Sequence, residues 1–258
     1  MKIIVLVKEV PDTYGERKLD LETGLADRAA SEAVLDEISE RALEVALSYA
    51  DSAPDTEVVV LSMAPESAAA TIRKGLAMGA ASAVHVTDPA LAGADLGLTA
   101  RTLAAAIRRT GFDLVITGNL STDGSGGVLP AMLAELLEVP NMTALSVVEV
   151  TADSVTGTRS ADDGDMRVRA PLPAVISINE ALPDARFPNF KGIMAAKKKP
   201  FETLSAADLG VDPEDVSAPA SIMTAIAEKP PRSAGVKITD EGDGGTKIAE
   251  YLIENRLV

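Results

Sequence analysis

Short apolar runs alternate with longer amphipathic segments, and this rhythm constrains the fold more than any other feature of the sequence. The continuous apolar run at 3–7 and the mainly apolar runs at 57–61, 83–86 and 114–117 are typical of strands buried on both faces. Between the first two runs, apolar residues recur at helical spacing, at Val34, Ile38, Ala42, Val45 and Tyr49. Repetition of strand and helix predicts right-handed crossovers and a mainly parallel sheet with helices on both faces.

Capping and turn residues indicate where the predicted helices begin and end. Ser31 is expected to cap the first helix. Pro65 suits the first turn of the second helix, and Gly79 suits its end. Further helices are predicted at about 95–109, before a glycine, and at 128–137.

The rhythm changes from residue 146 onward. Segments 146–150, 155–159, 166–169 and 174–178 have the pattern of strands without helices between them, and the Asp- and Gly-rich turn at 162–165 suits a hairpin. We therefore expect antiparallel additions to the same sheet. The predicted fold class is α/β, with a three-layer, doubly wound, mostly parallel sheet.

The predicted α/β domain covers residues 1–182. Periodicity is lost after Asn179 and returns only in a short helix near 247–254. Residues 183–258 are therefore expected to form an extended C-terminal arm with few internal contacts, and such an arm needs a partner surface to order it.

Composition excludes several kinds of chemistry. The chain has no cysteine and one histidine, so disulfides, thiolate metal sites and His-based metal clusters are excluded. His85, between two valines, is predicted to be a packed strand residue. The net charge of −15 argues against a nucleic-acid-binding face. No apolar run approaches the roughly 18–20 residues that span a bilayer, and we expect a cytoplasmic protein that is not membrane-embedded.

The segment 118–127 is the most informative loop, because it leaves a predicted strand and enters a predicted helix. In open parallel sheets, ligands bind beyond the carboxyl ends of the strands. The loop is rich in glycine and hydroxyl groups, and the amides of 126–129 would point outward at a helix N-terminus, where phosphate binds well. It lacks the Walker ending, and no GxGxxG follows the first strand, so ordinary NAD binding is not expected. We favour a nucleotide phosphate site; a plain flexible loop is the alternative.

A catalytic role has weak support in the sequence. Asp123 is the one candidate general base in the loop, and nothing in the sequence pairs with it. Acid–base catalysis normally needs two or more placed groups. Asp123 is therefore expected to be a turn or capping residue, and we predict no catalytic residues, no metal site and no bond-making chemistry.

A second signal is the Lys-rich segment 186–200. Phe187, Phe190, Ile193 and Met194 supply apolar area beside Lys191 and 197–199. An exposed apolar anchor ringed by cations suits docking onto an acidic protein. The alternative is an ordinary solvated helix start, which Lys runs often are.

Short motifs follow one another in a specific order along nearly the whole chain. They are VKEVPD at 7–12, TIRK at 71–74, AMGA at 77–80, VHV at 84–86, DLVITG at 113–118, AELL at 134–137, LPAV at 172–175, IMAAKKK at 193–199 and DLGV at 208–211. Each motif is weak alone, but the ordered set resembles the beta subunit of electron transfer flavoproteins.

The resemblance implies an adenine-nucleotide alpha-hydrolase-like fold and a heterodimer with an alpha subunit that holds the redox-active FAD. The beta subunit would bury a structural AMP, or a second FAD in relatives that bifurcate electrons. Loop amides and Ser125 would hold the phosphate. By resemblance, the cofactor contacts are Leu6, Asp36, Glu37, Ile38, Ser39, Met63, Gly118, Asn119, Ser121, Thr122, Asp123, Gly124, Ser125, Gly126, Gly127, Val128 and Leu129.

The Lys-rich segment resembles the family's recognition loop, which docks onto acyl-CoA and related dehydrogenases of fatty acid oxidation. A membrane quinone oxidoreductase is a further partner that the family implies. Phe190 stands where the family usually has an anchoring leucine, and Ala195 replaces a common lysine. The implied docking residues are Phe190, Lys191, Ile193, Met194, Lys197, Lys198 and Lys199.

The alternative function is a stand-alone ATP- or AMP-binding protein of the universal-stress type. The same sheet and Gly-rich loop could serve ATP. That interpretation leaves the Lys-rich segment and the C-terminal arm without a role.

Overall fold

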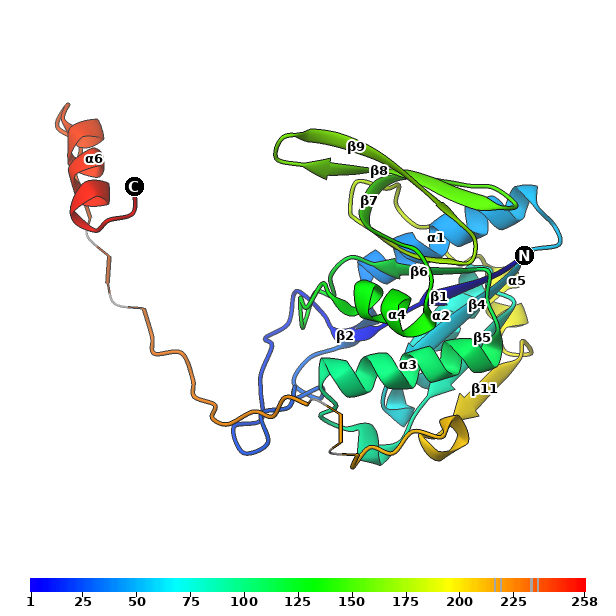
Figure 1. The fold of residues 1–258 in the computed structure, drawn as a ribbon. Coiled ribbons are helices and arrows are strands. Elements are labelled where there is room, and N and C mark those ends of the chain that lie inside the picture. The colour runs from blue at the N-terminus through cyan, green and yellow to red at the C-terminus, as the bar shows by residue number, and fades with distance from the viewer. Residues whose placement is uncertain (216, 219, 233, 236) are drawn as a thin grey trace. The chain divides into compact units, whose positions relative to one another are not determined.

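The computed structural model describes residues 1–215, 217–218, 220–232, 234–235 and 237–258. The chain divides into two units, Met1–Thr224 and Ala225–Val258. The first unit holds the sheet and its covering helices, and the second holds α6 (Gly244–Glu254) (Figure 1).

Within the described residues, the main sheet has nine strands in the order β11-β5-β4-β1-β6-β10-β7-β8-β9. All neighbours from β11 to β7 pair in parallel, and β8 pairs antiparallel with both β7 and β9. The strands are β1 (Lys2–Leu6), β4 (Glu57–Met63), β5 (Ser82–Val86), β6 (Leu114–Gly118), β7 (Asn141–Val150), β8 (Ser154–Ala161), β9 (Gly164–Pro171), β10 (Ala174–Ile178) and β11 (Phe201–Leu204). The predicted three-layer, mostly parallel α/β fold is confirmed.

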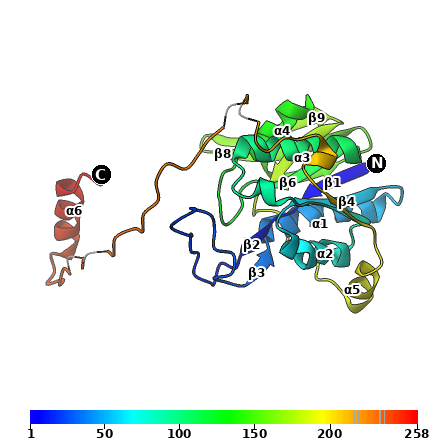
Figure 2. The ribbon, with the colours of Figure 1, turned by 90° about the horizontal axis from the view of Figure 1, so that it is seen from below.

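Helices cover both faces of the sheet. Figure 2 shows α1 (Glu37–Ser52) and α2 (Ala69–Met78) on one face, and α3 (Leu96–Thr110) and α4 (Leu129–Leu137) on the other. Alternate residues of β1, β4, β5, β6 and β10 enter the two cores, as expected for strands buried on both sides. The remaining helical elements are α5 (Phe190–Ala196) and the 3₁₀ turns Glu66–Ala68, Pro89–Leu91 and Ala207–Leu209.

The start of the first helix differs from the prediction. Ser31 is not its cap, because α1 begins at Glu37 and Asp36 occupies the cap position. The residues between them form β3 (Ala33–Leu35), which pairs antiparallel with β2 (Glu9–Pro11). Val34 therefore belongs to a strand, although its spacing also fits the helical pattern.

The strand at 174–178 also differs from the prediction, because β10 is not an antiparallel addition. It lies between β6 and β7 and is parallel to both. All five of its residues are buried, which is typical of a central parallel strand. Only the β8–β9 hairpin supplies the antiparallel additions (Figure 1).

Two short elements lie in the region where periodicity is lost. α5 packs on α2, and β11 extends the sheet beyond β5. Elements of seven and four residues are too short to show a reliable period. The domain boundary at residue 182 stays a prediction, as does the packing of an arm on a partner. Among the described residues, no helix is long and apolar enough to cross a membrane.

Candidate functional site

The candidate site lies at the carboxyl end of β6, where a close approach fixes the geometry. A Cβ at Gly118 would lie only 2.6 Å from Cγ2 of Ile38, so glycine is required for the strand end to meet the first turn of α1. The next amide, that of Asn119, donates to the carbonyl of Ile178 on β10 (2.8 Å). The loop that follows is therefore held against the residues that precede α1.

Asp36 is the most unusual residue of this site, because its carboxyl group is buried. The residue is 1% exposed, and Oδ2 accepts a hydrogen bond from the amide of Thr122 (2.9 Å). Oδ1 is buried with no hydrogen-bond partner, and so is the hydroxyl of Thr122. Burial raises the pKa of Asp36 and the charge of Asp123 adds to this, although the amides of Thr122 and Ile38 lower it. Unpaired buried polar atoms are costly, and here they belong to two residues that are joined by a hydrogen bond.

Asp123 has an ion-pair partner that the sequence did not reveal. Lys8 Nζ lies 2.7 Å from Asp123 Oδ1 and donates to the hydroxyl of Ser121 at 3.4 Å. Burial alone would raise the pKa of Asp123, but Lys8, together with the hydrogen bonds from Ser121 and the amide of Gly124, lowers it. The carboxylate also accepts the amide of the next residue, Gly124 (2.6 Å), a local contact within the loop. A salt-bridged carboxylate of lowered pKa is a poor general base.

The second half of the loop exposes backbone donors at the start of α4. Ser125 is in the left-handed region (φ 49°), and its amide and hydroxyl both donate to the carbonyl of Ser121. In the described part of the chain, no hydrogen bond is found from the amides of Gly126, Gly127 and Val128, and no side chain caps the helix. Uncapped amides at a helix N-terminus form an anion-binding site.

Of the other predicted cofactor contacts, Leu6, Met63 and Ser39 lie at the candidate site, whereas the side chain of Glu37 is turned to solvent. Leu6 and Met63 end β1 and β4 at the same carboxyl edge, and Ser39 Oγ accepts the amide of Lys8 (3.3 Å). Glu37 instead pairs with Arg41 (2.9 Å), and its side chain is 75% exposed.

Two positively charged side chains contact the loop, and the sequence did not predict either contact. Lys8 lies two residues after the end of β1, and its position beyond a parallel strand was the available signal. Arg17 donates to the carbonyl of Thr122 from the long segment before β3, where no sequence pattern indicates the contact.

The Lys-rich segment is fastened to α2. Lys199 Nζ donates to the carbonyls of Leu76 (2.9 Å) and Ala80 (2.6 Å), and burial lowers its pKa. Arg73 lies over the ring of Phe201 (4.5 Å) and donates to the carbonyl of Ala196. The ammonium of Lys199 thus faces the body of the protein.

The outer side of α5 is apolar and exposed. Phe190 is 80% exposed, and Ile193 and Met194 are about half exposed (46% and 48%). Asn189 caps the helix by accepting the amide of Gly192 (2.8 Å). An anchored segment that presents an aromatic ring to solvent has the form of a docking surface.

Ion pairs hold the start of the Lys-rich segment against α1. Arg186 contacts Glu44 and Asp51, each at 2.8 Å. Burial would raise the pKa of Glu44, but the bonds from Arg186 lower it. The chain between β10 and α5 is therefore held against α1 by ion pairs.

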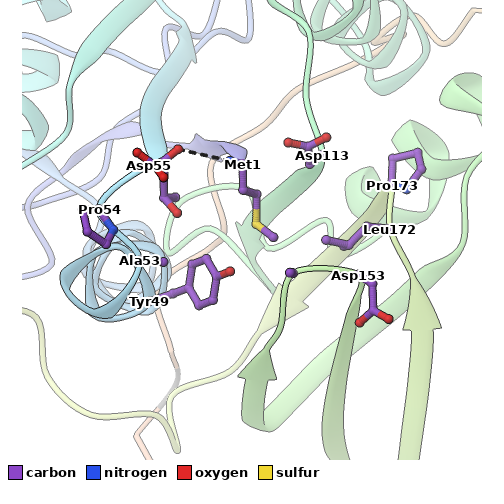
Figure 3. Close-up of a pocket in the computed structure, with 11 residues that line it drawn as sticks. Met1, Tyr49, Ala53, Pro54, Asp55, Asp113, Asp153, Leu172 and Pro173 are labelled. Atoms are coloured by element: carbon purple, nitrogen blue, oxygen red, sulfur yellow. Dashed lines mark hydrogen bonds between the residues drawn. The ribbon is translucent and has the colours of Figure 1, made fainter.

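A cavity of about 540 Å³ lies at the opposite, amino end of the strands. Figure 3 shows Met1 between Asp55 and Asp113, and its terminal amine donates to the carbonyl of Asp55 (3.2 Å). Its lining includes Asp55, Asp113 and Asp153, and the carboxylate of Asp113 accepts the amide of Lys2 (2.7 Å). It lies at the end of the strands opposite to the residues predicted to bind a cofactor.

Comparisons with known proteins point in one direction. Residues 23–209 match the family described as Electron transfer flavoprotein domain. The chain is 46% identical to the electron transfer flavoprotein subunit beta of Mycobacterium leprae, over 99% of each chain. It is 31% identical to the same subunit of Megasphaera elsdenii, over 98% of this chain and 97% of that one. It is also 34% identical to the caffeyl-CoA reductase-Etf complex subunit CarD of Acetobacterium woodii, over 83% and 82%.

Proposed function

This chain belongs to the electron transfer flavoprotein family, and from that premise we propose that it is the beta subunit of a heterodimer whose alpha subunit carries FAD. The complex would accept electrons from dehydrogenases and pass them onward, with this chain acting as a carrier subunit without bond-making chemistry. FAD supplies the redox chemistry when bound. This chain's own residues bind a nucleotide, position the FAD held by the alpha subunit and dock dehydrogenases, in a cytoplasmic complex.

The observation that carries the nucleotide assignment is the buried, half-satisfied carboxyl group of Asp36 beside uncapped helix amides. In our proposal the amides of 126–129, with Ser125, bind a phosphate. Asp36 accepts hydrogen bonds from sugar hydroxyls or the base amine, and Leu6 and Met63 pack against the base. The residues therefore fit an adenine nucleotide, which we propose to be a structural AMP.

A second FAD is the alternative ligand for the same site. It shares the adenylate portion with AMP, so the contacts named above serve either molecule. The Acetobacterium woodii relative is named as part of a caffeyl-CoA reductase-Etf complex. The nucleotide found in the purified complex decides between the two.

The docking proposal rests on the exposed face of α5. Phe190 is the proposed anchor, with Ile193 and Met194 as its apolar surround. Lys191, Lys197 and Lys198 would attract an acidic dehydrogenase surface, such as that of an acyl-CoA dehydrogenase. We propose that Lys199 takes part by fixing the segment to α2. A membrane quinone oxidoreductase is the proposed acceptor of the electrons.

The test is to co-express the chain with the alpha subunit encoded in the same genome. We expect a 1:1 complex that carries FAD and is reduced by an acyl-CoA dehydrogenase in the presence of its substrate. A stable homodimer that binds ATP and recovers no flavoprotein partner would contradict the proposal and favour the universal-stress alternative.

A further inference from the structure

Lys8 lies where three separate segments of the candidate nucleotide site meet. Its amide donates to Ser39 Oγ (3.3 Å), and its carbonyl accepts the amide of Asp36 (2.9 Å). Its side chain crosses to the loop after β6, where Nζ contacts Asp123 and Ser121. One residue thus connects the end of β1, the start of α1 and the Gly-rich loop.

The carboxyl groups around this point pose an electrostatic problem for an anionic ligand. Asp36 and Asp123 both lie at the loop whose amides are proposed to bind phosphate, and the two charges repel each other. A phosphate would add further negative charge to the same small region. In the part of the chain that the structure describes, Lys8 is the only basic side chain bonded to either carboxyl group.

The ammonium group of Lys8 lies against the loop backbone. A Cβ at Gly124 would lie 3.8 Å from Lys8 Nζ, an ordinary van der Waals distance, so the two residues are close neighbours. The Asp123 oxygen that contacts Lys8 also accepts the amide of Gly124 (2.6 Å). The ion pair therefore holds the backbone of the loop as well as the charge of Asp123.

We propose that Lys8 is a positioning residue that neutralises Asp123, and so allows the loop to bind the phosphate of an adenine nucleotide. Its ammonium acts on the carboxylate and not on the phosphate directly. The inference rests on the proposed function, and it adds a residue and a role that the nucleotide site was not expected to have.

The experiment is a double-mutant cycle in the co-expressed heterodimer depleted of nucleotide. Calorimetry measures AMP binding to the wild type, Lys8→Met, Asp123→Asn and the double variant. We expect Lys8→Met to weaken binding about 10-fold or more, as for loss of a charge-assisted contact. Asp123→Asn should tighten binding a few-fold, because it removes negative charge near the phosphate. The double variant should regain most of the lost affinity, and Lys8→Arg should stay close to wild type.

The outcomes separate this inference from the proposed function. A double variant as weak as Lys8→Met would mean that Lys8 contacts the phosphate or only supports the fold, and would overturn the proposal. A markedly weaker Asp123→Asn would also overturn it, even if Lys8→Met failed to fold. Wild-type complex that does not bind AMP would refute the nucleotide site itself, whereas wild-type binding with an unaffected Lys8→Met would refute only the role of Lys8.

Discussion

Gly118→Ala should damage both stability and nucleotide binding, because the new methyl group would strike Ile38. The added Cβ would lie 2.6 Å from Cγ2 and 2.8 Å from Cγ1, about 1 Å inside a normal carbon–carbon contact. Overpacking of this kind typically costs about 1–3 kcal/mol. For a chain of this size, about 2 kcal/mol corresponds to a fall in Tm of roughly 4–8 °C.

A shift of Ile38 would also disturb the candidate nucleotide site. Ile38 belongs to the first turn of α1, between Asp36 and Ser39, so moving it moves the carboxyl group that accepts the amide of Thr122. We expect AMP to bind about 10-fold more weakly, since a charge-assisted hydrogen bond contributes roughly 1.5–3 kcal/mol. Thermal unfolding and calorimetry of the heterodimer measure the two effects.

A second substitution tests whether this contact is the cause. Ile38→Ala removes the two atoms that the methyl group would strike, so Gly118→Ala should be less damaging in that background. The two changes should be non-additive by about 1–2 kcal/mol, as for residues in direct contact. Additive effects, or a Gly118→Ala complex with normal stability and AMP affinity, would refute the reasoning.

Three further predictions concern docking and pH. Phe190→Ala should slow electron transfer from the dehydrogenase about 30-fold, since a truncated anchor often costs about 2 kcal/mol. Stopped-flow kinetics measure this, Phe187→Ala (93% exposed) is the matched control, and equal effects of both variants would contradict the anchor role. Asp36→Asn should stabilise the fold near neutral pH while weakening AMP binding. Because the pKa of Asp36 is raised in the folded protein, the free energy of unfolding falls as pH rises from the usual carboxyl pKa toward the raised one. Unfolding curves of Asp36→Asn, measured as a function of pH, should lack this fall. Glu44 shows the opposite sign, because Arg186 holds its pKa down: its contribution is present above the usual pKa and is lost as pH falls through the lowered value. Glu44→Gln should therefore flatten the acid limb of the stability curve, and an unchanged limb would contradict the assignment.

Local patterns were sufficient for most of the framework. The buried runs that became β1, β4, β5 and β6 each form a strand within about two residues of the predicted range. The start of α3 also agrees, where Asp95 accepts the amide of Leu98 (2.8 Å). These features depend on periodicity and caps, which neighbouring residues determine. Pro65 does not lie in the first turn of the second helix as predicted, because the 3₁₀ turn Glu66–Ala68 separates it from α2.

Features that depend on distant residues could not be predicted in this way. The partner of Asp123 is 115 positions away in the sequence, and no local pattern relates it to Lys8. The parallel pairing of β10 depends on which gap in the sheet the chain fills after the hairpin. The chemistry of Ser31 suits a helix cap, but the pairing of β2 with β3 places it before a strand. The candidate loop was recognised because its glycines and hydroxyl groups are contiguous, whereas the buried state of Asp36 appears only in three dimensions.

The nucleotide content of the native heterodimer tests the central claim most directly. Denaturing the purified complex and quantifying the released cofactors by chromatography and mass spectrometry should yield the FAD of the alpha subunit plus one further adenine nucleotide per beta chain. AMP would support the structural site, and a second FAD would support the bifurcating form of the same site. Release of a single FAD and no other nucleotide would contradict the account.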